Sequence, residues 1–131
     1  MLKTNKTYII KLNDEIIGES NLEKADPPMG VVFGEIVDKK VINYAFIKSY
    51  CQKNGIEVAD DYPKEKLIST RTIEELKVFS PENVEIKGIG NQITGMDSEG
   101  FEICIEGVGY PFYEKEFPHH VREYEERFKE K

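Results

Sequence analysis

Phe101-Glu102-Ile103-Cys104-Ile105-Glu106 places a large apolar side chain at every second position. Successive side chains of a strand point to opposite faces of a sheet, so the three apolar side chains share one face. This pattern is typical of an antiparallel strand with one buried and one exposed face. The register points Cys104 away from the apolar row, whereas a free cysteine is usually buried. A helix over that side would reconcile the two expectations.

Runs of turn-forming residues predict that this strand belongs to an antiparallel sheet built from hairpins. The polar tip 95–100 joins it to a preceding strand, and Asn13-Asp14-Glu15 joins two strands near the N-terminus, because Asn and Asp tolerate positive φ. Pro27 and Pro28 lack amide donors, so they are expected in a loop before the next strand. The predicted strands are Thr7–Leu12, Ile16–Ser20, Met29–Val37, Val84–Thr94 and Phe101–Val108.

Two segments have the apolar spacing of helices. Ile42–Asn54 places apolar side chains on a broad arc and is followed by Gly55, which favours the left-handed conformation that closes a helix. Pro118 suits the first position of a second helix, which is predicted to run to about Lys129. Spacings of four, three and four residues give this helix a narrow apolar stripe, Phe117, Val121, Tyr124 and Phe128.

These elements together predict an α+β fold. We expect a mainly antiparallel sheet of five or six strands that carries two packed helices, at about 42–54 and 118–129. A chain of 131 residues has the size of one domain, so residues 1–131 are predicted to form a single domain. The polar segment Glu57–Lys66 is predicted to be a loop, whereas Leu67–Ser80 fits both a helical turn and an extended strand.

The composition excludes several classes of protein. With 18 basic and 25 acidic residues the net charge is −7, which argues against a nucleic-acid partner, because phosphate binding needs clustered Lys and Arg. The sequence contains no run of about 18 apolar residues, so no membrane span is predicted. The apolar residues Tyr8-Ile9-Ile10 are followed at once by charged residues, so no signal peptide is expected. Cys51 and Cys104 are therefore predicted to be reduced thiols of a cytoplasmic protein.

No motif of catalysis or of metal or cofactor binding stands out. His119 and His120 are adjacent in a predicted helix, where their side chains point about 100° apart and do not easily share one metal ion. Ser98 lies at a hairpin tip, without the strand and helix that flank a hydrolase serine. The segment 88–93 has two glycines of a dinucleotide-binding fingerprint but lacks the third and the following helix. We expect no metal and no cofactor.

An aromatic loop offers one alternative site. Gly109-Tyr110-Pro111-Phe112-Tyr113 carries three aromatic side chains around a proline, and the favoured interpretation is a plug at the edge of the core. The alternative is a small enzyme or ligand-binding domain with an aromatic pocket. Its lining would be Tyr110, Phe112, Tyr113, His119 and His120.

Acidic residues are concentrated on the second predicted hairpin. Residues 82–106 contain six acidic side chains and one basic side chain, and such a cluster serves either solubility or a basic partner. The sequence favours a non-enzymatic protein-binding module, of the immunity type that neutralises a basic toxin such as a nuclease. A third hypothesis is an assembly subunit that pairs through a sheet edge. The predicted partner-binding residues are Glu85, Asp97, Glu99, Glu102 and Glu106.

Overall fold

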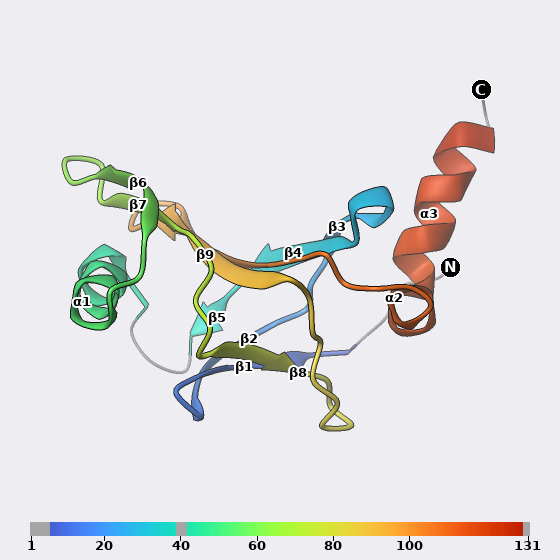
Figure 1. Ribbon diagram of the computed structural model, residues 1–131. Coiled ribbons are helices and arrows are strands. Elements are labelled where there is room, and N and C mark those ends of the chain that lie inside the picture. Colours follow the sequence, from blue (N-terminus) through green and yellow to red (C-terminus); the bar gives the residue numbers. More distant parts are fainter. Residues whose placement is uncertain (1–5, 39–41, 130–131) are drawn as a thin grey trace.

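A computed structural model describes residues 6–38 and 42–129 of the chain and shows two antiparallel sheets with helices at their ends (Figure 1). The predicted α+β class is confirmed. The larger sheet has six strands in the order β3-β4-β10-β9-β7-β6. Its strands are β3 (Lys24–Asp26), β4 (Val31–Glu35), β10 (Gly100–Glu106), β9 (Gly90–Met96), β7 (Leu67–Thr70) and β6 (Val58–Tyr62).

Strand β10 lies inside this sheet and has the predicted alternation. Phe101, Ile103 and Ile105 are buried, whereas Glu102 and Cys104 are half-buried on the opposite face. Its neighbours are β9 and β4, which pair antiparallel with it. The alternation thus decides which face of the sheet meets the core.

A second sheet, of four strands, was not predicted. Its order is β5-β2-β1-β8, and the predicted hairpin near the N-terminus forms its centre, with positive φ at Asn13 and Asp14. The predicted strand Met29–Val37 divides at Ile36, where the chain leaves the larger sheet and adds the edge strand β5 to the smaller one. The strands are β1 (Tyr8–Leu12), β2 (Glu15–Ser20), β5 (Val37–Asp38) and β8 (Leu76–Phe79).

The core lies between the two sheets. Figure 1 shows the smaller sheet below one face of the larger one. Apolar side chains from both sheets are buried there, among them Ile10, Leu12, Ile17, Val32, Val78, Ile93 and Ile103.

Two predicted segments need correction, and the structure resolves a third that the sequence left ambiguous. The predicted loop Glu57–Lys66 contains strand β6, which forms a hairpin with β7. The ambiguous segment Leu67–Ser80 supplies one strand to each sheet, β7 and β8, with a turn at Glu74-Glu75 between them. The predicted strand Val84–Thr94 is a regular strand only from Gly90, where β9 of the larger sheet begins. Residues 84–89 form a single bridge to the smaller sheet, between Phe79 and Glu85, and no regular strand.

The first predicted helix is confirmed as α1 (Tyr44–Asn54). The side chain of Asn43 accepts a hydrogen bond from the amide of Phe46, and Gly55 closes the helix with a φ of 65°. Helix α1 packs below the β7 end of the larger sheet, on the same side as the smaller sheet (Figure 1). The hydroxyl of Tyr44 and the ammonium of Lys48 both contact the carboxylate of Asp61 on β6.

The other end of the molecule is formed by η1 (Pro27–Met29), α2 (Phe112–Glu116) and α3 (Pro118–Lys129). The predicted C-terminal helix is confirmed as α3, which packs against α2 and η1 rather than across a sheet face. In its stripe Phe117 is fully buried and Val121 and Tyr124 are half-buried, while the side chain of Phe128 lies outside the described residues. None of the described helices is both long and apolar enough to cross a membrane.

Candidate functional site

The outer face of the six-stranded sheet, which points away from the smaller sheet, has no layer over its centre in the described chain (Figure 1). We call it the open face. Strand register assigns its side chains, because residues directly opposite each other on paired strands point to the same side. They are Lys24, Asp26, Val31, Phe33, Glu35, Asp60, Tyr62, Leu67, Ser69, Gln92, Thr94, Met96, Glu102, Cys104 and Glu106.

The open face combines an apolar middle with acidic surroundings. Phe33 and Cys104 lie opposite each other on β4 and β10, and both remain half-buried where a covered sheet face would bury them completely. Five of the side chains on this face are acidic and one, Lys24, is basic. Such a surface is suited to a partner that is both apolar and positively charged.

A groove of about 490 Å³ crosses the open face near the β9–β10 turn. Four carboxylate residues line it, Glu23, Glu35, Glu99 and Glu102, together with Lys24, Leu67, Thr94, Met96 and others. A second hollow, of about 470 Å³, shares Glu23 and Glu35 with it and continues along the edge of β4 toward β2. The two hollows form one acidic path around that edge.

Hydrogen bonds hold two of the carboxylates of this path, those of Glu23 and Glu102, in place. The Glu23 carboxylate accepts a hydrogen bond from the amide of Glu35 at 2.9 Å. The Nζ of Lys24 lies 2.7 Å from Oε2 of Glu102 and 5.8 Å from the centre of the Phe33 ring. The hydrogen bond with Glu102 raises the pKa of the Lys24 ammonium, so this lysine stays charged at neutral pH.

The structure brings only some of the predicted partner-binding residues together. Glu102 and Glu106 lie on the open face, and Glu99 lines the groove. Asp97 instead accepts a hydrogen bond from the Tyr44 amide at 2.8 Å, at the start of α1. Glu85 lies beside β8, at its bridge with Phe79.

Sequence reasoning missed Glu23 and Glu35, which line both hollows. Neither lies in the acidic segment 82–106, so a count of charges along the chain does not single them out. The alternation of Phe33 and Glu35 within β4 is a signal that could have placed Glu35 on an outward face.

The residues of the alternative aromatic pocket are mainly packed against the protein itself. The Tyr113 hydroxyl donates to the carbonyl of Val31 at 2.9 Å, and the ring is fully buried. The Tyr110 hydroxyl donates to the carbonyl of Pro27 at 3.0 Å, and its ring stacks on Tyr113. Phe112 is half-buried against the core. These contacts favour the interpretation of this loop as a plug at the edge of the core.

The two histidines are also buried. A ring nitrogen of His120, Nε2, lies 2.8 Å from the carbonyl oxygen of Leu22, and the two imidazole centres are 4.0 Å apart. Burial and the neighbouring imidazole of His120 lower the pKa of His119, against smaller opposite effects of Glu123 and Glu116. His119 is therefore neutral in the folded protein at neutral pH.

This lowered pKa predicts a loss of stability in weak acid. In the unfolded chain His119 takes up a proton near its ordinary pKa of about 6.5, whereas the folded protein resists protonation until a lower pH. Its contribution to stability is therefore complete above pH 6.5 and is lost as the pH falls through the folded pKa. We expect the free energy of unfolding, measured by urea titration at several pH values, to fall more steeply below pH 6.5 in the native protein than in His119→Gln. Equal slopes would show that His119 is not held neutral.

The alkylation rate of Cys104 measures how buried its thiol is on the open face. Burial, with smaller effects of Glu106 and Glu102, raises the pKa of the Cys104 thiol to about 11. Only the thiolate form of a cysteine is alkylated. The alkylation rate of Cys104 with iodoacetamide at pH 8 should therefore be about two orders of magnitude below that of a free cysteine peptide. Peptide mass spectrometry distinguishes the alkylation of Cys104 from that of the buried Cys51. A rate that saturates near pH 8.5 would contradict the environment described for this face.

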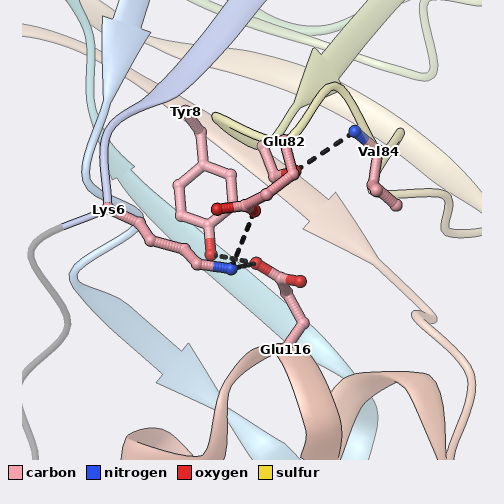
Figure 2. Close-up of polar contacts among 6 residues, drawn as sticks. Lys6, Tyr8, Glu82, Val84 and Glu116 are labelled. Carbon is pink, nitrogen blue, oxygen red and sulfur yellow. Dashed lines mark hydrogen bonds and ion pairs between the residues drawn. The ribbon is translucent and has the colours of Figure 1, made fainter.

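A separate polar cluster joins the start of β1 to α2 (Figure 2). The Tyr8 hydroxyl on β1 donates to Oε2 of Glu116 on α2 at 2.6 Å, and Nζ of Lys6 lies 2.8 Å from the same oxygen. Lys6 also pairs with Glu82 at 3.1 Å. The side chains of Lys6, Tyr8 and Glu116 point toward one another in Figure 2, so we interpret the cluster as a structural clasp between β1 and α2.

Comparison with known proteins finds no matching family model, no significantly similar curated protein and no significantly similar solved structure. Within residues 6–38 and 42–129, no three His, Cys, Asp or Glu side chains are grouped so that they could hold a metal ion. The open face with its acidic groove is the candidate functional site because it combines a groove of about 490 Å³ with half-buried apolar side chains.

Proposed function

We propose that this chain is a non-enzymatic binding module that takes a basic protein partner on its open face. In its specific form the proposal is an immunity-type protein that neutralises a basic toxin, such as a nuclease, in the cytoplasm. One observation carries the proposal: five acidic side chains and one basic side chain surround half-exposed apolar residues on an uncovered sheet face.

The physical case has two parts. Complementary charge accelerates the encounter of two proteins and favours the correct orientation, so an acidic face selects basic partners. Apolar side chains in the middle of the face, Phe33 and Cys104, supply contact area that loses water when the partner covers it. A nuclease needs a basic surface to bind phosphates, and an acidic face that covers this surface would block its substrate.

The proposal requires the gene next to the one for this chain to encode a basic protein, so a neighbouring product that is not basic would contradict the immunity role. The test purifies this product and measures its association rate with the chain by stopped flow at increasing salt. We expect the rate to fall with salt, and the double reversal Glu35→Lys/Glu102→Lys to lower it at least about tenfold at low salt. Glu74→Lys/Glu75→Lys is the matched control, because it makes the same change of net charge at exposed residues away from the open face. Equal rates for both double variants would remove the open face from the proposal, and a neighbouring toxin that stays active in the complex would remove the immunity role.

A further inference from the structure

We propose that Lys24 is a built-in substitute for a cationic side chain of the partner, and that an arginine or lysine of a basic protein segment takes its place on Glu102 and Glu35. This inference rests on the proposed function, since it specifies how the open face recognises a basic partner. The partner must therefore displace Lys24 when it binds.

The surroundings of Lys24 already have the chemistry of a cation site. Its Nζ lies 2.7 Å from Oε2 of Glu102 and 5.8 Å from the centre of the Phe33 ring. A carboxylate beside an aromatic face is the combination that binds ammonium and guanidinium groups. The Lys24 side chain remains 53% exposed, so it can leave this position without opening the core.

The groove holds more negative charge than Lys24 can neutralise. Glu35 and Glu102 lie directly opposite each other on β4 and β10, and like charges in that position repel. Glu23 and Glu99 line the same groove, where Lys24 is the one basic residue against four carboxylates. A cation that bridges two carboxylates would relieve this repulsion better than Lys24 does.

The shape of the groove suits a long cationic side chain. Leu67 and Met96 lie opposite each other on β7 and β9, and both line the groove beside the carboxylates. The aliphatic stem of an arginine or lysine packs on such apolar groups while its charged end reaches the acids. The fork of a guanidinium can contact both Glu35 and Glu102, which lie close together as directly opposed residues.

Charge also selects the kind of occupant. A second copy of this chain has a net charge of −7 and would bring its own acidic face against this one. A nucleic acid would place its negatively charged phosphates against the carboxylates of the face, and like charges repel. A basic segment of another protein is the occupant that complements the face.

The experiment measures the binding of a fluorescein-labelled hexa-arginine peptide to the full chain by anisotropy, at low and at physiological salt. Lys24→Met keeps the stem, removes the competing ammonium, and should bind the peptide about fivefold more tightly than the native chain. Lys87→Met is the matched control, because it removes one positive charge from an exposed residue outside the groove, and its affinity should stay within about twofold. Glu102→Gln and Glu35→Gln should each weaken binding about tenfold.

Each alternative result has a separate meaning. If Lys24→Met and Lys87→Met strengthen binding equally, net charge alone acts and the substitute role of Lys24 is wrong, while the proposed function stands. The same holds if Lys24→Met binds no more tightly than the native chain. If neither the native chain nor any variant prefers hexa-arginine to hexa-citrulline, the groove takes no cation and the proposed function loses its carrying observation. Circular dichroism and melting temperature confirm that each variant is folded.

Discussion

Replacement of Phe117 by alanine is expected to lower the free energy of unfolding by about 3–5 kcal/mol, the usual cost of removing a fully buried aromatic ring. Phe117 has no exposed surface and lies where α2 ends and α3 begins. Its ring is 5.3 Å from that of Tyr113, 5.8 Å from that of Tyr8 and 5.9 Å from that of His120, centre to centre. Its loss removes contacts that join β1, α2 and α3.

Urea unfolding followed by circular dichroism measures this loss. Val121→Ala is the control on the same helix, because Val121 is only half-buried and should cost about 1 kcal/mol. Phe117→Leu keeps most of the volume and should recover much of the stability. A Phe117→Ala protein within about 1 kcal/mol of the native stability would show that α3 is not anchored through this ring.

Local patterns in the sequence predicted the elements whose side chains alternate or repeat regularly. The alternation in 101–106 identified both faces of β10, and Asn43, Gly55 and Pro118 bound the helices close to the predicted positions. Strand β6 was missed because it is nearly all exposed, at an edge of the sheet, and its sequence Val-Ala-Asp-Asp-Tyr has no apolar period. The pattern of one strand carries no information when neither of its faces is buried.

The acidic groove could be predicted only in part, because it depends on pairing between distant strands. Glu35 and Glu102 are 67 positions apart in sequence and become neighbours only when β4 pairs with β10. Glu85 and Asp97 belong to the same acidic segment as Glu102, yet one lies beside β8 and the other bonds to α1. Counting charges along the chain therefore predicted that the surface is negatively charged. The register of the sheet decides which carboxylates lie together in the groove.

The second large effect is expected at the clasp between β1 and α2, where Glu116→Ala should cost about 1–3 kcal/mol of stability. The Glu116 side chain is 11% exposed and accepts from the hydroxyl of fully buried Tyr8 and from Lys6 (Figure 2). Its removal leaves the Tyr8 hydroxyl in the interior without this acceptor. Tyr8→Phe removes the hydroxyl instead, so the double variant Tyr8→Phe/Glu116→Ala should be destabilised by less than the sum of the two single variants.

Alkaline pH provides a second measurement of the same bond. Burial, followed by the hydrogen bond to Glu116, raises the pKa of the Tyr8 phenol above its ordinary value of about 10. The unfolded chain releases this proton near pH 10 while the folded protein retains it, so the contribution of Tyr8 is complete below pH 10 and is lost as the pH rises toward the folded pKa. The native protein should therefore lose stability between pH 9 and pH 11, and Tyr8→Phe should lose less over the same interval.

Tyr113 has a pKa raised by burial in the same direction, so some loss should remain in Tyr8→Phe and decrease further in Tyr8→Phe/Tyr113→Phe. Identical alkaline slopes in the native protein and Tyr8→Phe, together with additive costs in the double variant with Glu116→Ala, would show that the clasp contributes nothing to joining α2 to the sheets.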